Sequence, residues 1–467
     1  MTGRSAPRTP HLEIRSDHPV QRVHTMSAMA ANGERLHSDV LIIGGGPGGC
    51  AAALQLEKHG ISAILLEKAR FPRDKVCGDA LSGKVMRALE RLDPALAARI
   101  TTDPQRMPSW GVVFVAPGGG SLRVPFSPET GKGEAPGAIL PRFAFDAQLF
   151  DAAKSCALVR VLQGQAAVKF DRVAEGWCVE STAVANAPGV QVHCRLVIDA
   201  SGANSMFARH VAGITMEPRH HAAGVRAYYR GVRDLDQQGF IELHFLKDLL
   251  PGYLWIFPLP DGRANVGLGL RSDRVRERRL DLRSELVRLI ADHPTLRTRF
   301  KGAVREGDIQ GMGLPLASKR HRLSGDGYVL VGDAGHLIDP FTGEGISHAI
   351  ISGMHAADVT RDMVFRNDFS ANATRTYDGR VWKRLGQELA ISARLQKLAH
   401  QAWLFDFVVE RAKRNPALAD TISSMFTDLD LRAALRRPGF YMDLLLGRGP
   451  RKAVQRTRSA TTNQSQG

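Results

Sequence analysis

Residues 40–67, VLIIGGGPGGCAAALQLEKHGISAILLE, constrain the fold more than any other stretch of the chain. An apolar run typical of a strand buried on both faces leads into a glycine-rich turn. A helical pattern follows, and a second apolar run ends at Glu67. The turn carries a fingerprint made of Gly44, Gly46, Pro47 and Gly49. This order of strand, tight turn, helix and strand predicts a Rossmann-like unit built on a parallel sheet.

The fingerprint also predicts a dinucleotide site. We expect Gly44 to permit the turn, Gly46 to let a pyrophosphate approach the backbone, and Gly49 to let the helix pack closely. The N-terminus of that helix supplies partial positive charge for the phosphates. Glu67 lies 23 residues after the first glycine, where a carboxylate accepts hydrogen bonds from ribose hydroxyls. The alternative is a glycine-rich turn that binds no ligand, but the preceding strand, the following helix and Glu67 together disfavour it.

A second segment, GDAGHLIDPFTGEGISHAI at 332–350, indicates which dinucleotide is bound. A strand ends at Gly332-Asp333, where a carboxylate can hold a hydroxyl of a ribityl chain. A helix begins at Gly345, two residues after Gly343, and its N–H groups favour a group that gains negative charge, as one edge of reduced flavin does. NAD has no ribityl chain. The segment therefore predicts the flavin end of an FAD site, with an ordinary strand–turn–helix as the alternative.

The rest of the chain divides by pattern. We expect a helix at 81–100, a hairpin at 111–126, a helix from near Phe143, alternating strands at 222–270, and helices at 273–301 and about 370–447. The predicted fold is α/β, with a Rossmann-like FAD-binding domain, an inserted antiparallel β-sheet substrate domain and C-terminal helices. The expected parts are a disordered leader at 1–37, an FAD-binding domain at 38–105, 138–215 and 306–365, a β-rich substrate domain at 106–137 and 216–305, a helical region at 366–447 and a basic disordered tail at 448–467.

Five separated motifs resemble those of the geranylgeranyl reductase family, within the flavoprotein group that includes aromatic hydroxylases and flavin-dependent halogenases. Together they span residues 38–355, roughly. The motifs are the fingerprint with Glu67, FPRDKVCGDALSG at 71–83, PRFAFDAQLF at 141–150 with VIDASGANS at 197–205, the segment from 332, and GYLWIFPLPDGRANVG at 252–267.

The resemblance implies roles for residues in these motifs. Cys77 lies beside the flavin and is the candidate catalytic residue, while Arg142 reaches the flavin or its diphosphate. The implied cofactor contacts are Gly78, Asp79, Gly332, Asp333, Gly345 and Ile346, and the implied cavity residues are Tyr253, Trp255 and Phe257. The loop reads Cys-Gly-Asp where the family has Cys-Gly-Gly, a departure that bears on the substrate. Plain packing is the alternative role for Cys77, Trp255 and Phe257.

The resemblance further implies an FAD-dependent oxidoreductase that saturates C=C bonds of an isoprenoid, geranylgeranyl-type substrate. Such a reaction needs an apolar, dry cavity, which the aromatic strand 252–259 suits. A phosphate-bearing head would need cations, for which the candidates are Arg219, Arg226, Arg230 and the arginines of 271–288. No second dinucleotide fingerprint is present, so the external reductant is NAD(P)H bound transiently or a ferredoxin-like carrier.

Two other functions stay open. A flavin-dependent monooxygenase or halogenase would use the same fold, although Tyr253 and Phe257 replace two residues of the Trp-x-Trp-x-Ile-Pro motif of halogenases. A non-catalytic, flavoprotein-derived lipid binder is the other alternative, and it has no need of both ends of the FAD site.

The composition limits which binding partners and which cellular compartment we expect. The net charge of +16 and basic clusters at 271–288 and 448–459 favour anionic partners, and we expect an anionic membrane surface to be one. No zinc module or aromatic RNA-binding strand occurs, so nucleic acid is not expected. No apolar run spans a bilayer and no signal peptide is evident, which predicts a cytoplasmic, membrane-peripheral protein. Five scattered cysteines lack metal-ligand spacing, so neither a metal site nor a disulfide framework is expected.

Overall fold

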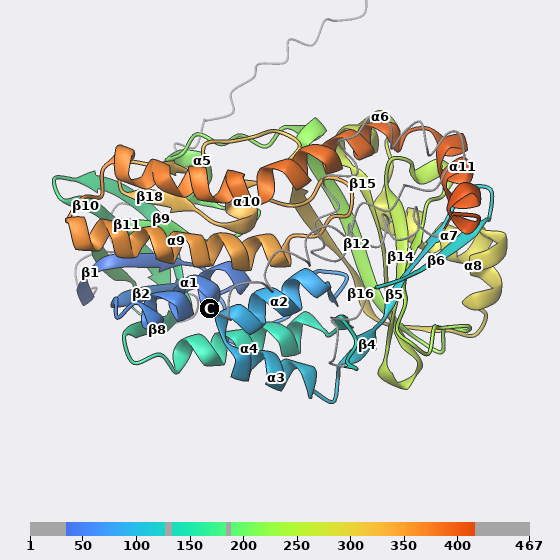
Figure 1. Cartoon of the computed structure of the whole chain (residues 1–467), viewed down its shortest axis with the longest axis horizontal. Helices are drawn as coiled ribbons and strands as arrows, with labels where there is room; N and C mark the ends of the chain where they lie inside the picture. The colour runs from blue at the N-terminus through green and yellow to red at the C-terminus, as the bar shows by residue number, and fades with distance from the viewer. Residues whose placement is uncertain (1–33, 127–132, 184–187, 416–467) are drawn as a thin grey trace, which may run out of the picture.

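The computed structural model describes residues 34–126, 133–183 and 188–415. Two large β-sheets lie side by side, with long helices over the first and shorter ones at the far end of the second (Figure 1). This arrangement confirms the predicted α/β class with an inserted second sheet.

The first sheet contains, within the described residues, eight strands, and five of them run parallel in the order β18-β11-β1-β2-β8. Strands β9 and β10 continue it as an antiparallel extension beside β11. The strands are β1 (Glu34–Ile43), β2 (Ala63–Glu67), β8 (Val159–Gln163), β9 (Gln165–Val173), β10 (Gly176–Ala183), β11 (Val190–Asp199), β17 (Ser324–Gly325) and β18 (Tyr328–Leu330).

Both faces of this sheet are covered, which explains the continuous apolar run at the end of β1. Val40 and Ile42 pack into a core with the long helices, whereas Leu41 and Ile43 pack on the other face with Trp177. The helices around the sheet are α1 (Pro47–Lys58), α2 (Gly83–Leu92), α3 (Pro94–Thr101), α4 (Arg142–Lys154), α5 (Met206–His210), α9 (Ile346–Arg366) and α10 (Ala371–Leu398).

The second sheet has seven strands in the described part of the chain, ordered β16-β12-β15-β14-β13-β5-β6. All neighbours are antiparallel except β13 and β5, which are parallel. The strands are β5 (Gly111–Val115), β6 (Ser121–Pro125), β12 (His221–Arg230), β13 (Ile241–His244), β14 (Tyr253–Leu259), β15 (Arg263–Arg271) and β16 (Val304–Pro315).

The two faces of the second sheet have different covers. Leu254 and Ile256 face a core shared with the arginine-rich helices, while Trp255 and Phe257 face the opposite side. The helices are α6 (Ser272–Glu277), α7 (Leu282–Asp292), α8 (Pro294–Arg299) and α11 (Ala402–Lys413). A three-stranded sheet, β3 (Ala80–Leu81), β7 (Gly137–Ile139) and β4 (Met107–Ser109), contacts both α2 and β14 through β7.

The structure differs from the sequence-based expectation at several boundaries. The expected helix 81–100 is two helices, because Pro94 lacks an N–H and Asp93 caps α3 by accepting hydrogen bonds from two backbone N–H groups. The boundary expected at 305/306 falls inside β16, which pairs with β12 in the second sheet. Strand β1 begins at Glu34, so the end of the expected leader is a strand paired with β11. The tail at 448–467 lies outside the described residues.

Helices α1 and α9 meet at a glycine contact, which generates a stability prediction. A Cβ at Gly353 would lie 2.2 Å from the carbonyl oxygen of Gly48, whereas a Cβ at Gly379 of α10 has nothing within 4 Å. We expect Gly353→Ala to lower the free energy of unfolding by about 1–3 kcal/mol, since α9 must move away. The matched control Gly379→Ala should raise it by about 0.5–1 kcal/mol through helix propensity. Urea denaturation measures both, and equal stability of the two variants would contradict the close contact.

Candidate active site

A cleft of about 120 Å³ follows the path that the sequence assigned to the cofactor. It begins at the first turn of α1, passes the loop at 75–77 and ends at the N-terminus of α9, with β16 as its other wall. The predicted cofactor residues that line it are Gly46, Pro47, Arg142, Gly332, Asp333, Gly343, Gly345 and Ile346. Cys77 lines it as well.

The glycines of the fingerprint have separate roles. A Cβ at Gly44 would lie 2.5 Å from the carbonyl oxygen of Ala200, and φ is +100°, so the turn requires glycine there. A Cβ at Gly49 would lie 1.8 Å from the carbonyl oxygen of Gly44. At Gly46 the nearest atom would be an Arg73 nitrogen at 3.9 Å, so this position opens onto free space. An open backbone there is what the approach of a pyrophosphate requires.

The two helix N-termini at the cleft fit FAD. The helix α1 starts at Pro47, and α9 starts at Ile346 with Gly345 as its N-cap residue. Each N-terminus carries partial positive charge, one suited to a diphosphate and one to a ring that gains negative charge. Near the second end, Asp333 is paired with Lys75 at 3.3 Å, a lysine of the cleft wall that sequence reasoning missed.

Glu67 lies directly beneath the fingerprint loop. Its two carboxylate oxygens accept hydrogen bonds from the N–H groups of Gly45 at 2.6 Å and Ala69 at 2.7 Å. The side chain is 5% exposed, and it braces the loop from within. A contact with the ribose hydroxyls, as expected from the sequence, would use the remaining lone pairs of these oxygens.

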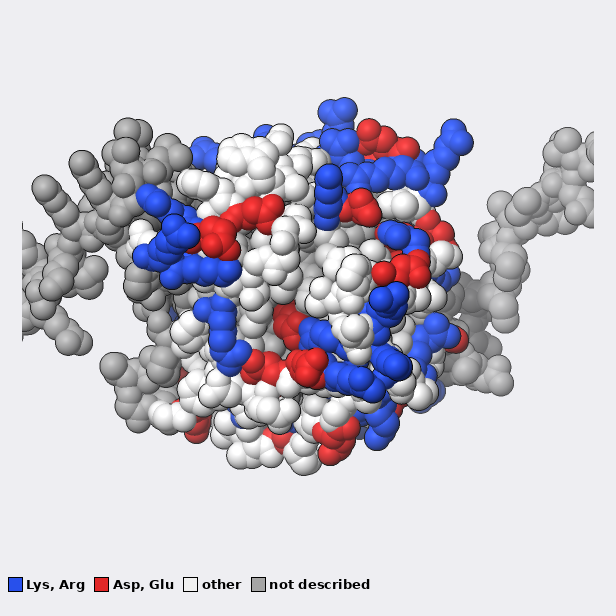
Figure 2. All heavy atoms as spheres, turned by 90° about the vertical axis from the view of Figure 1, so that its right-hand side faces the viewer, with Lys and Arg blue, Asp and Glu red and all other residues white. Residues whose placement is uncertain are grey.

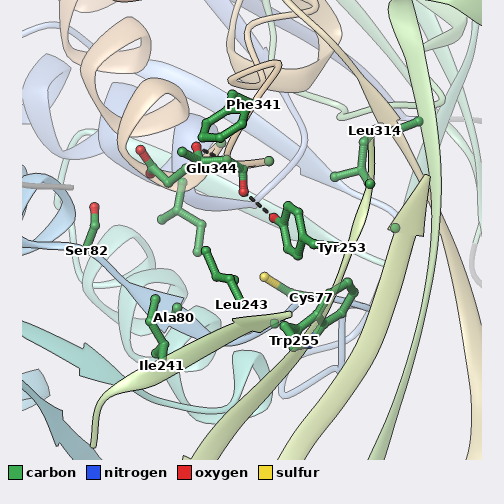
Figure 3. A pocket seen from close by; sticks show the side chains of 18 of the residues that line it. Cys77, Ala80, Ser82, Ile241, Leu243, Tyr253, Trp255, Leu314, Phe341 and Glu344 are labelled. Atoms are coloured by element: carbon green, nitrogen blue, oxygen red, sulfur yellow. Dashed lines mark hydrogen bonds between the residues drawn. The ribbon is translucent and has the colours of Figure 1, made fainter. Parts of the chain in front are cut away.

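An apolar cavity of about 180 Å³ adjoins the cleft. Tyr253, Trp255 and Phe257, the residues that the resemblance assigns to the substrate, line this cavity from alternate positions of β14. Figure 3 shows Tyr253, Trp255 and Cys77 along one side of the cavity and Ser82 on the other. The hydroxyl of Tyr253 donates to the carbonyl oxygen of Thr342, which fixes the ring against the segment that precedes α9.

One wall is common to the cleft and the cavity. Cys77, Gly343, Gly345 and Ile346 line both, together with Met312 and Leu314 of β16. The last two belong to a strand that sequence reasoning did not connect with the site, because nothing in GMGLP marks it. A flat group in the cleft and an apolar chain in the cavity would therefore meet beside Cys77.

Asp79 was expected at the cofactor, and the structure places it elsewhere. Its carboxylate is fully buried and accepts hydrogen bonds from the hydroxyl of Tyr228 and the amide of Asn265, both at 2.7 Å. It also accepts one from the backbone N–H of Arg142 at 3.2 Å. Asp79 is not among the residues that line the cleft or the cavity. Its role is to anchor the loop that carries Cys77.

Asn265 completes this anchor, which sequence reasoning missed. Its amide also donates to the carbonyl oxygen of Cys77 at 2.8 Å, and its own oxygen accepts from the indole N–H of Trp255 at 2.9 Å. One side chain thus ties the Cys77 loop to the aromatic wall of the cavity. The sequence feature that could have identified Asn265 is a polar residue between two apolar neighbours, Ala264 and Val266, in a strand buried on both faces.

The cationic residues that line the cleft or the cavity are already paired. Arg142 forms a bidentate ion pair with Asp146, with both distances 2.7 Å, and is 2% exposed. Burial alone would raise the pKa of Asp146, but the guanidinium of Arg142 outweighs it and holds that pKa below the ordinary value. The arginines that were candidates for binding a phosphate head differ in position. Arg226 and Arg230 form ion pairs with Asp74 and Glu306, and Arg219 is exposed. Arg271 lines the cavity but is paired with Asp273.

The Asp79 junction gives a pH prediction. Burial raises the pKa of Asp79 from 3.8 to about 6, against the hydrogen bonds of Tyr228 and Asn265 that lower it. The folded protein therefore holds this proton more tightly than the unfolded chain does. Its contribution to stability is most favourable below pH 4 and declines by up to about 3 kcal/mol as the pH rises through 6.

Asp79→Asn removes this titration. The slope of the free energy of unfolding between pH 4.5 and 7, measured by urea denaturation, should be more negative for the parent protein than for the variant. Identical slopes would contradict the raised pKa.

Comparisons with known proteins agree with this geometry. The FAD binding domain family matches residues 37–358. A digeranylgeranylglycerophospholipid reductase of Thermoplasma acidophilum is 32% identical over 354 residues, which cover 74% of this chain and 83% of that protein. A menaquinone reductase of Mycobacterium tuberculosis is 29% identical over 368 residues, with 77% and 84% covered.

Solved structures show the same fold. A geranylgeranyl bacteriochlorophyll reductase-like protein of Thermoplasma acidophilum superposes with a TM-score of 0.73 at 25% identity, covering 88% of this chain and 98% of that one. A flavin-dependent brominase shares the fold at a TM-score of 0.67 and 23% identity, with 84% and 93% covered. From its FAD-binding fold and its reductase relatives, this chain belongs to the geranylgeranyl reductase family of FAD-dependent oxidoreductases.

Proposed function

We propose that this protein saturates carbon–carbon double bonds of a geranylgeranyl-type isoprenoid. The observation that carries the proposal is the wall shared by the cofactor cleft and the apolar cavity, with Cys77 in it. The relatives named for reduction of a digeranylgeranyl phospholipid and of menaquinone support the same substrate class. An apolar cavity lined by aromatic and aliphatic side chains suits an isoprenoid chain.

FAD, when bound and reduced, supplies a hydride to one carbon of the double bond, and the other carbon takes a proton. The residues of the chain position the substrate and exclude water. A Cβ at Gly78 would lie 2.7 Å from the ring of Phe257, so the loop rests directly on the aromatic wall. The N–H groups at the start of α9 stabilise negative charge at that end of the cleft. The electrons come from NAD(P)H or a ferredoxin-like carrier.

The test uses the reduced holoenzyme under anaerobic conditions with geranylgeranyl phospholipid, prenylated quinone and free polyprenol as probes. Mass spectrometry should show the gain of two hydrogens for each reduced double bond. A parallel incubation in air with bromide and a phenolic acceptor tests halogenation. Halogenated product together with unreduced isoprenoid would overturn the proposal.

Cys77 is proposed as a catalytic residue of this reaction. We expect Cys77→Ser to keep FAD bound and to slow alkene reduction by about tenfold or more, while flavin reduction changes less; each tenfold corresponds to about 1.4 kcal/mol. Rapid mixing measures the two half-reactions separately. Cys156→Ser, a half-buried thiol remote from the cleft and the cavity, is the matched control. Parent-like rates in both half-reactions for Cys77→Ala would show that Cys77 only packs the loop.

The substrate is delivered at a membrane surface, and α11 is the docking element. Trp403 is 64% exposed and Phe407 37% exposed on one side of this helix, while Phe405 stacks on Phe245 with ring centroids 4.3 Å apart. The end of the molecule that carries α11 faces the viewer in Figure 2, where Lys and Arg side chains are prominent around paler surface. Exposed aromatic residues beside basic ones fit an anionic interface. Within the described residues, none of the helices is long and apolar enough to cross a bilayer.

Liposome flotation tests this docking. The parent holoenzyme should float with anionic vesicles at low salt and be released at high salt, because screening weakens the attraction. The double variant Trp403→Ala, Phe407→Ala should bind several-fold less. Phe365→Ala is the matched control, since Phe365 is 90% exposed but lies on α9. No flotation of the parent at low salt would sink the membrane proposal.

A further inference from the structure

The indole ring of Trp255 lies across strand β15 at a place with little side-chain volume. Trp255 pairs directly with Gly267, and Gly269 follows two residues later on the same face. A Cβ at Gly267 would lie 2.3 Å from Cζ2 of the indole, and one at Gly269 would lie 3.9 Å from Cζ3. Glycine thus makes room for the ring, but it offers no side chain that could fix the direction in which the ring points.

The direction of the ring is fixed by Asn265, two residues before Gly267 on the same strand. The side-chain oxygen of Asn265 accepts a hydrogen bond from the indole N–H at 2.9 Å. Asn265 is fully buried and Trp255 is 6% exposed. Loss of the acceptor would therefore leave a buried N–H without a partner, which costs more than the same loss at an exposed position. This hydrogen bond gives the contact between the ring and β15 a defined direction.

The amide nitrogen of Asn265 holds a second element of the shared wall. It donates to the carbonyl oxygen of Cys77 at 2.8 Å and to the carboxylate of Asp79 at 2.7 Å. Turning the amide over would set its NH2 group against the indole N–H and its oxygen against that carboxylate, so a single orientation satisfies all three partners. One side chain therefore couples the indole of Trp255 to the backbone of Cys77.

Asn265 acts through its neighbours and not by contact with a bound molecule. In the described part of the chain it is not among the residues that line the cleft or the cavity, whereas Trp255 lines the cavity and Cys77 lines both. The hydroxyl of Tyr228 still donates to Asp79 when Asn265 is changed. We therefore expect a change at Asn265 to loosen the Cys77 loop without detaching it from the second sheet.

We propose that Asn265 is a positioning residue: it fixes the indole of Trp255 relative to Cys77, and so holds a double bond of the substrate beside the cofactor cleft. The last step rests on the proposed function, because it takes an isoprenoid as the occupant of the cavity. The coupling of Trp255 to the Cys77 loop does not depend on the identity of the substrate. A ring that is free to turn lets the bound chain shift, so that fewer complexes have a double bond in place.

The first experiment measures the coupling in the FAD-loaded protein without substrate. Hydrogen exchange of the peptide at 74–80 reports on the loop, and alkylation by N-ethylmaleimide in a Cys156→Ser background reports on the Cys77 thiol, since the other cysteines are buried. Asn265→Ala should speed both by about three- to tenfold, the range for one lost neutral hydrogen bond. Asn372→Ala, which removes an exposed amide on α10, is the matched control and should change neither. Unchanged exchange and alkylation in Asn265→Ala would overturn the proposal.

The second experiment follows the two half-reactions of the holoenzyme by anaerobic rapid mixing with a C20 polyprenol. Asn265→Ala should slow substrate reduction at saturation by about tenfold or more, while flavin reduction and the affinity for the polyprenol change by less than about threefold. A packing defect alone would impair flavin reduction and binding as well. Trp255→Phe keeps an aromatic ring without the N–H, so the losses from Asn265→Ala and Trp255→Phe should combine to less than their product. A full product of the two losses would overturn the action of Asn265 through Trp255.

Asn265→Asp is the conservative variant that separates hydrogen bonding from packing. It keeps an oxygen for the indole but sets a second carboxyl group against Asp79, and two carboxyl groups in contact share a proton. The protonated carboxyl regains one donor, so substrate reduction by Asn265→Asp should recover relative to Asn265→Ala as the pH falls from 8 to 5. The charged and titratable side chains that face Asp79 are Tyr228 and Arg226, and both are the same in the two variants. Equal pH profiles of the two variants would overturn the role of the donor.

The outcomes separate the positioning role from the proposed function. If Asn265→Ala loses FAD, Asn265→Ser, which keeps a hydroxyl at the position, replaces it in both experiments. A loosened loop together with parent-like substrate reduction would overturn the positioning role and leave the reductase intact. Absence of reduced isoprenoid with the parent protein would refute the proposed function, and hydrogen exchange and alkylation would still decide whether Asn265 holds the Cys77 loop.

Discussion

A buried carboxylate with three donors holds the site together. Asp79 receives hydrogen bonds from β12, from β15 and from the first residue of α4, and these elements belong to different parts of the fold. An unpaired carboxylate in this position would carry the full cost of desolvation, so the three elements are fixed relative to one another. The loop from 75 to 79 is drawn against the second sheet as a result. The position of Cys77 in the shared wall follows from that contact.

The two sheets that meet at this junction contribute different parts of the site. The parallel sheet contributes turns and helix N-termini, which are general devices for phosphates and for negative charge. The antiparallel sheet contributes the side chains of β14, which face the cavity at every second position. A reductase-like protein and a brominase share this fold, so the fold alone does not decide the chemistry.

The sequence predicted those parts of the structure that depend on interactions between residues close together in the chain. The fingerprint turn and the alternation around Trp255 each depend on neighbours within a few residues, and each was placed correctly on its element. The strand expected to end at Gly332 instead ends at Leu330, and Gly332 begins a 3-10 helix. Asn265 was missed because its partners Asp79 and Cys77 are 186 and 188 residues away, and periodicity carries no information on such pairings. The same reason applies to β16, whose contribution to the cleft depends on register with β12. Asp79 was assigned to the cofactor because adjacent residues in a motif were treated alike, although a positive φ of 68° turns this residue away from its neighbours.

The strand order has a consequence for how the protein is made. β1 and α1 appear early during synthesis, but strand β18, which pairs with β11, and helix α9 come from residues 328–366. A nascent chain that lacks them has the end of the cleft at α1 but lacks the end at the N-terminus of α9. FAD stabilises only the state to which it binds, so a truncated or stalled product gains nothing from it. FAD binding thus distinguishes completely folded chains from incomplete ones, and flavin absorbance reports the fraction of chains with the native topology.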